Sequence, residues 1–156
     1  MTDLATRRMM LSGLGAGALG TTIAMAAPEG AEAAAPSVRG TWTIAPKTAR
    51  GPAPFHALAA FAAGGVFVTT GSDEAGTGLG EWSQSDASGF AFTYLNFHFD
   101  SAGKPANTVK VRAAGTFHGS QLSGRATLST FDPSGKRLSP DARFTFIGNR
   151  VSIQAP

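Results

Sequence analysis

Histidines are the first side chains to consider for chemistry, because an imidazole can bind a metal ion or move a proton near neutral pH. The chain has three, His56, His98 and His118, and it has no cysteine. A metal site needs ligands that converge on one point. In alternating strands His98 and His118 point away from the side that Phe99 and Phe117 occupy, so we expect these histidines on the surface. The sequence therefore predicts no metal site and no cofactor.

Carboxylate and hydroxyl side chains form no recognisable catalytic set either. Glu81 alternates with Trp82, so we expect it to face solvent instead of acting as a buried general acid. Ser83, Ser85 and Ser129 lack the Gly-x-Ser-x-Gly context of a serine hydrolase nucleophile. The glycine-rich stretches are typical of turns, not of a phosphate-binding loop. No reaction can be read from the sequence.

The remaining charged residues suggest structural roles. Asp100 and Asp132 each begin a turn-forming stretch, so we expect their carboxylates to cap these turns. Arg112 and Arg125 are expected on one outer face, where they either bind an anion or only keep the protein soluble. The formal charge is +3, but lysines and arginines are scattered, which argues against a nucleic-acid partner.

Aromatic residues are the strongest candidates for binding. A buried Tyr or Trp can offer a hydrogen-bonding group at the edge of an apolar pocket, although the same residues can simply fill a core. Alternation predicts an inward set of Trp42, Phe61, Trp82, Phe92, Tyr94, Phe117, Leu122, Leu128 and Phe144. Within it, the candidate ligand pocket consists of Phe61, Trp82, Phe92, Tyr94, Phe117 and Phe144.

The composition and the spacing of turn-forming residues predict short strands that would position these residues. Charged residues are only 15 % of the chain and glycine occurs 20 times, which is typical of an all-β protein with tight turns. The central feature is a long hairpin over Gly89–Gly119. The other predicted strands are Gly40–Ile44, Phe55–Phe61, Val66–Thr70, Leu79–Gln84, Leu122–Ser129 and Phe144–Ile153.

Three local alternatives accompany this strand pattern. A helix over Phe55–Ala63 competes with a strand, but Gly64-Gly65 and the β-branched run that follows favour a hairpin. Gly148-Asn149 is either a turn or a bulge, and we expect a bulge, because a closed antiparallel ring needs an even number of strands. A second bulge near Leu95-Asn96 would put Phe97 and Phe99 inside. A regular strand would leave both outside, where a partner surface or a dimer would have to cover them.

The N-terminus is typical of an export signal. Arg7-Arg8 precedes a weakly apolar, glycine-rich run, and Ala24-Met25-Ala26 offers a cleavage site. This arrangement resembles a twin-arginine signal; an ordinary secretory signal and an N-terminal helix of the domain are the alternatives. We expect a signal peptide at residues 1–26, a disordered linker at 27–37 and the β-barrel at 38–156. The mature protein is expected outside the cytoplasm, in the periplasm, cell wall or extracellular space.

Gly40-x-Trp42 on the first strand and Arg150 near the end resemble the lipocalin and calycin barrels. The resemblance implies that Trp42 closes the barrel floor and that Arg150 packs over its ring. A wider set of residues is similar to small bacterial barrels of the allene-oxide-cyclase-like group, some of which are cyclases. This set consists of Phe55-His56-Ala57-Leu58, Phe61 with Gly64-Gly65, Gly80-Glu81-Trp82, Phe97-His98-Phe99-Asp100 with Gly103, Val111-Arg112 and Phe131-Asp132-Pro133-Ser134-Gly135.

These observations predict an all-β, eight-stranded antiparallel up-and-down barrel of lipocalin-like type. The function we expect is the binding of a small apolar molecule inside an exported barrel. The alternatives are a cyclase or isomerase that folds a flexible apolar substrate by pocket shape, and a structural or protein-interaction module with a filled interior. We expect no membrane partner for the mature form, and a homodimer is considered as well.

Overall fold

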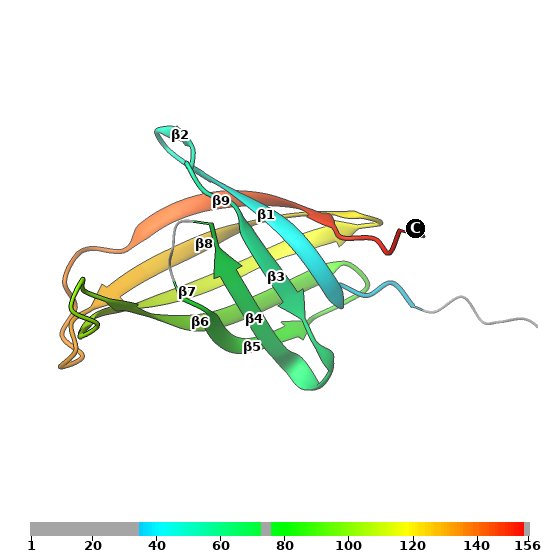
Figure 1. The fold of residues 1–156 in the computed structure, drawn as a ribbon. Coiled ribbons are helices and arrows are strands. Elements are labelled where there is room, and N and C mark those ends of the chain that lie inside the picture. The colour runs from blue at the N-terminus through cyan, green and yellow to red at the C-terminus, as the bar shows by residue number, and fades with distance from the viewer. Residues whose placement is uncertain (1–34, 73–75, 155–156) are drawn as a thin grey trace, which may run out of the picture. The chain divides into compact units, whose positions relative to one another are not determined.

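The computed structural model describes residues 35–72 and 76–154, and these residues form one β-barrel. The expected signal peptide at residues 1–26 and most of the expected linker at 27–37 lie outside the described residues. From Gly40 onward the strands follow one another as in Figure 1. They are β1 (Gly40–Thr48), β2 (Gly51–Pro52), β3 (Ala57–Phe61), β4 (Val66–Gly71), β5 (Gly78–Gln84), β6 (Gly89–Phe99), β7 (Pro105–His118), β8 (Gln121–Phe131) and β9 (Ala142–Arg150).

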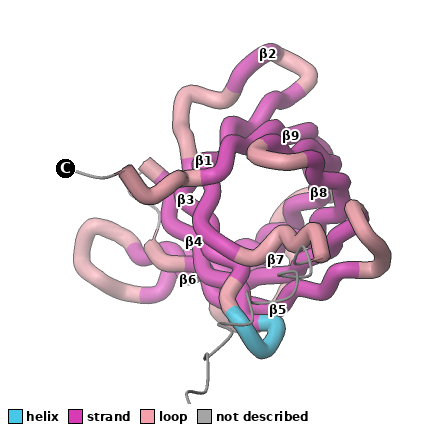
Figure 2. Tube along the Cα trace, turned by 90° about the vertical axis from the view of Figure 1, so that its right-hand side faces the viewer, coloured by secondary structure: helices cyan, strands magenta, loops and turns pink. Residues whose placement is uncertain are grey.

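The sheet is closed and antiparallel throughout. Strands β3 to β9 pair in sequence order, and β1 pairs with both β3 and β9. The two-residue β2 only folds back on the end of β1, so eight strands make up the ring. Figure 2 shows these strands encircling an interior. The predicted eight-stranded up-and-down barrel is therefore confirmed.

The hairpin over Ala57–Gly71 is also confirmed, and the alternative helix over Phe55–Ala63 is wrong. Strand β3 pairs with β1 on one side and with β4 on the other. The turn between β3 and β4 is a single 3₁₀ turn, η1 (Ala63–Gly65), in which Gly64 and Gly65 have φ values of 74° and 81°. Glycine adopts this left-handed conformation without strain.

Neither expected bulge is present. Gly148 and Asn149 pair in register with both neighbours, β1 and β8, so β9 is regular up to its end at Arg150. Strand β6 is regular through His98, and its register shifts only at His98/Phe99. The regular strand therefore points Asn96 inward. This side chain is 8 % exposed and donates a hydrogen bond to the carbonyl of Gly76.

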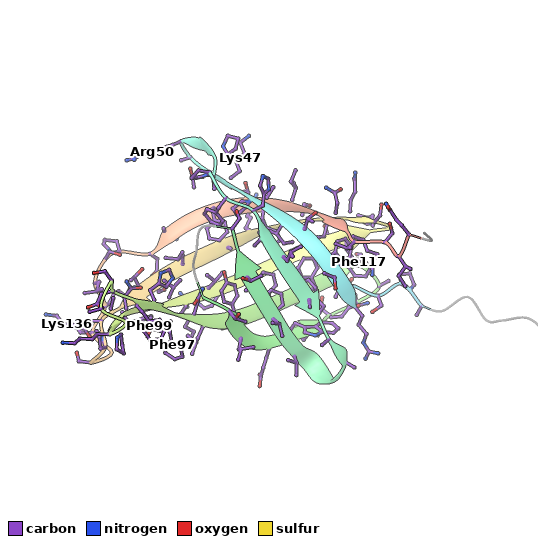
Figure 3. All side chains as sticks on the ribbon, viewed as in Figure 1. Lys47, Arg50, Phe97, Phe99, Phe117 and Lys136 are labelled. Carbon is purple, nitrogen blue, oxygen red and sulfur yellow. The ribbon has the colours of Figure 1, made fainter. Side chains whose placement is uncertain are left out.

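Because β6 is regular through His98, the alternative without a bulge applies and Phe97 points outward; Phe99, after the register shift, is exposed as well. Phe97 and Phe99 are 57 % and 60 % exposed, and Figure 3 shows them at the end of the barrel opposite Phe117. Leu79 and Leu95, which pair across β5 and β6, are exposed on the same outer face. The described part of the barrel thus carries an outer apolar strip of Leu79, Leu95, Phe97 and Phe99.

One end of the barrel is closed by Trp42, which is fully buried. Its indole N–H donates a 2.8 Å hydrogen bond to the carbonyl of Val38. The guanidinium carbon of Arg150 lies 4.3 Å from the Trp42 ring centroid, in the range of a cation–π contact. Arg150 also donates hydrogen bonds to the carbonyls of Ser37, at 2.7 Å, and Arg39. This end is called the closed end below.

Substitution of Trp42 by Ala tests the closed end. Removing a fully buried indole leaves a cavity and frees the Val38 carbonyl, so we expect the free energy of unfolding to fall by about 3–5 kcal/mol. Urea unfolding of Trp42→Ala beside Thr43→Ala, a neighbouring exposed position, measures the difference. A loss below about 0.5 kcal/mol would show that Trp42 does not hold the barrel shut.

Candidate ligand-binding site

The interior is divided into a packed half and a hollow half. In the packed half, next to the closed end, aromatic rings meet edge to face around Phe61. Its ring centroid lies 5.0 Å from that of Phe67, 5.7 Å from that of Trp82 and 5.5 Å from that of Phe90. Phe117 is buried here as well and packs against Phe90. The rings in this half therefore contact one another directly.

The other half holds a cavity of about 220 Å³. Its walls come from both sides of the barrel and from the loop between β2 and β3, which contributes Ala53 and Phe55. Most lining side chains are apolar, and several positions carry only alanine. The lining residues are Ile44, Pro46, Thr48, Ala53, Phe55, Ala57, Ala59, Phe67, Thr69, Phe92, Tyr94, Val111, Ala126, Leu128, Ala142, Arg143, Phe144 and Phe146.

One wall of the cavity is a stack of aromatic rings. Phe67 and Phe92 lie nearly parallel, with centroids 4.3 Å apart and planes 8° apart, and Tyr94 continues the stack 5.5 Å from Phe67. The ring of Tyr94 lies directly over Gly78, where an added Cβ would come within 2.7 Å of the tyrosine Cδ2. The glycine in β5 therefore lets the tyrosine ring lie flat against the wall.

The candidate pocket residues are divided between the two halves. Phe92, Tyr94 and Phe144 line the cavity. Phe61 and Phe117 are buried in the packed half, and Trp82, half-buried, packs against Phe61 and donates its indole N–H to the carbonyl of Ala62. None of these last three lines the cavity.

Residues that the sequence interpretation missed complete the lining. Phe67 and Thr69 follow the same alternation as the aromatics of β6, so the pattern could have identified them. Arg143 at the start of β9 precedes Phe144 and lines the cavity from its rim. Nothing in the local sequence distinguishes this arginine from the other surface arginines.

Polar groups in the lining are few. Thr69 donates its hydroxyl to the carbonyl of Leu58 at 2.9 Å, so its hydrogen-bonding demand is met within the barrel. Tyr94 and Arg143 are the titratable residues of the lining, and it contains no histidine, aspartate or glutamate among the described residues. The cavity suits the exclusion of water from an apolar molecule more than acid–base chemistry.

The histidines do not come together. His118 is exposed as expected, and His56 is exposed as well. His98 is half-buried and on the inward side of β6, so its expected surface position was wrong. The reason is the missing bulge, which leaves Phe97 and Phe99 outside and His98 inside. In the described part of the chain, no three His, Asp or Glu residues are placed to hold a metal ion.

The expected turn and surface positions agree with the structure. Asp100 accepts backbone hydrogen bonds from Ala102 and Lys104, and Asp132 accepts them from Ser134 and Lys136. Hydrogen bonds hold the pKa of the Asp132 carboxyl below its ordinary value, and the bond from the Ser134 hydroxyl has the largest effect. Glu81 is exposed.

A charged cluster outside the barrel holds the loop between β8 and β9. Asp141 accepts a 2.7 Å hydrogen bond from the buried hydroxyl of Ser129 and forms ion pairs with Arg112 at 3.2 Å and Arg137 at 3.1 Å. The Ser129 hydrogen bond is the main cause that lowers the pKa of Asp141. Desolvation opposes it by a smaller amount, and the guanidinium groups of Arg137, Arg112 and Arg143 each lower the pKa further. The cluster is a structural clamp for this loop.

Comparison with known proteins does not assign this chain to a family. No family model, curated protein or solved structure matches this chain. The closed eight-stranded antiparallel barrel is consistent with a lipocalin-like fold. No helix among the described residues is long and apolar enough to cross a membrane.

The lowered pKa of Asp141 predicts an acid-sensitive contribution to stability. A carboxylate whose pKa is lower in the folded state stabilises that state above its unfolded pKa, about 3.9, and loses the contribution as the pH falls through the folded value. We therefore expect Asp141→Asn to be less stable than the wild type at pH 7, with the difference shrinking below about pH 4. Urea unfolding at pH 7 and pH 3 measures this, and an equal difference at both values would contradict it.

Proposed function

We propose that this protein binds a small apolar molecule in the hollow half of its barrel. The observation that carries the proposal is the cavity of about 220 Å³, bounded by the Phe67–Phe92–Tyr94 stack on one side and by small alanine side chains elsewhere. Each buried methylene contributes about 0.8 kcal/mol, so a short hydrocarbon can bind usefully without any polar contact. The volume is below the roughly 300–1,000 Å³ of pockets for drug-sized ligands, which favours a smaller one.

A cyclase or isomerase is the second candidate. It is supported by the resemblance to allene-oxide-cyclase-like barrels and by the flat aromatic wall, against which a flexible substrate could be held in one conformation. The absence of an acid–base pair from the described lining favours binding over catalysis. Mass spectrometry of a ligand before and after incubation distinguishes the two, because a binding protein returns it unchanged.

A third candidate is contact with another copy of the chain. The outer apolar strip of Leu79, Leu95, Phe97 and Phe99 is the observation that favours it, because exposed apolar side chains gathered on one face often mark interfaces. Sedimentation of the wild type beside Phe97→Ser separates a dimer from a monomer.

Export is also part of the proposal. The basis is the sequence alone: Arg7-Arg8, the glycine-rich run that follows and the small residues up to Ala26. A twin-arginine route is the proposed mechanism. Replacement of both arginines by lysine should then retain the protein in the cytoplasm, whereas an ordinary secretory signal would tolerate this change.

Filling the cavity tests the binding proposal. Ala57 lines the cavity near its rim, so Ala57→Phe should occupy part of the space and weaken binding of 1-octanol, a neutral apolar probe, by at least about tenfold. Isothermal titration calorimetry measures the affinity, and apolar burial should give a negative heat-capacity change.

Ala114→Phe is the matched control, because it adds the same ring at an exposed, outward position of β7. Circular dichroism establishes that both variants fold. Octanol that binds Ala57→Phe as tightly as the wild type, or does not bind the wild type at all, would contradict the proposal.

A further inference from the structure

A groove on the outer surface of the barrel adjoins the cavity. It has a volume of about 300 Å³ and is lined by Lys47, Thr48, Ala49, Arg125, Arg143, Phe144 and Thr145. Thr48, Arg143 and Phe144 also line the cavity, so the cavity and the groove share an edge between β1 and β9. A molecule that binds in the cavity and passes this shared edge would reach the groove.

The register of three neighbouring strands brings cations together in this groove. Thr145 of β9 pairs with Lys47 of β1 on one side and with Arg125 of β8 on the other. Paired residues point to the same face, so Lys47 and Arg125 flank Thr145 on the outside of the barrel. Arg143 lies two residues before Thr145 on β9 and completes the group. Figure 3 labels Lys47, which lies where β1 continues toward β2.

The cations of the groove form no ion pair among the described residues. No carboxylate belongs to the groove lining among the described residues. Asp141, two residues before Arg143, interacts with it electrostatically but uses its oxygens for Ser129, Arg137 and Arg112, and the described ion pairs include none to Lys47, Arg125 or Arg143. Cations held close together repel one another, and a bound anion would relieve this repulsion.

We propose that the ligand is an amphipathic anion. Its apolar chain occupies the cavity, and its carboxylate or phosphate head lies in the groove between Arg143, Arg125 and Lys47. Planar guanidinium groups bind such heads through paired, charge-assisted hydrogen bonds. This inference rests on the proposed function and adds the chemistry of the head group.

Three probes of equal chain length test the inference: 1-octanol, octanoate and octyl phosphate. Against the full protein in low salt, we expect at least one of the anions to bind about tenfold more tightly than the alcohol. The tighter anion identifies the head group. Raising the ionic strength should reduce the affinity of the anion and leave that of the alcohol unchanged.

Substitutions of the groove cations give a second readout. Arg125→Gln and Arg143→Gln should each weaken binding of the anion by about tenfold, as expected for loss of a hydrogen bond to a charged group. Arg125→Gln should leave octanol binding unchanged, because Arg125 lines the groove and not the cavity. Lys136→Gln is the control, because Lys136 is an exposed cation in the loop between β8 and β9, far from Lys47 in Figure 3.

The outcomes separate the two proposals. Octanol that binds as tightly as both anions, or anions unaffected by the two arginine substitutions, would overturn the head-group inference and leave the apolar cavity in place. No binding of any probe would overturn the proposed function, and the head-group inference with it.

Discussion

Pairing of the first strand with the last is the constraint on which the rest of the structure depends. A barrel has no free edges only if β1 and β9 meet in register. Trp42 and Arg150 are direct partners in that pairing, so the indole and the guanidinium that cover the closed end also join the two ends of the sheet. The chain has no cysteine, and this junction is held entirely by hydrogen bonds and packing.

The size of the inward side chains then decides where the barrel is full and where it is hollow. Near the closed end the inward positions carry Trp42, Phe61, Phe90 and Phe117, whose rings fill the cross-section. Toward the other end they carry Ala57, Ala59 and Ala126, which leave the aromatic wall of β4 and β6 facing open space. Voids of this size are uncommon in protein cores and cost packing energy, which is the physical reason for our proposal that a ligand binds here.

Much of this fold could be predicted from the sequence, because alternation has a period of two and reports which face a residue occupies. It identified the inward side of β8 through Leu122 and Leu128, while turn-forming residues identified the capped turns at Asp100 and Asp132. Alternation does not report the level of a residue along the barrel axis. That is why Phe61, Trp82 and Phe117 were assigned to the pocket although they lie in the packed half.

The errors at β6 had a different origin. The expected bulge rested on the assumption that every aromatic side chain of the strand is buried, and a regular strand instead buries Asn96 and exposes Phe97. The group of cations in the outer groove could not be predicted for a third reason. Lys47, Arg125 and Arg143 are far apart in the sequence and meet only through the register of β1, β8 and β9. Such convergence depends on closure of the whole sheet.

Xenon is the most direct probe of a barrel that is full at one end and hollow at the other, because it occupies dry apolar cavities without any polar contact. Crystals of the protein equilibrated with xenon gas should show density between Ala57, Phe92 and Leu128, and none among Trp42, Phe61 and Phe117. Absence of xenon from the first position, or its presence in the second, would contradict the division of the interior into a packed and a hollow half.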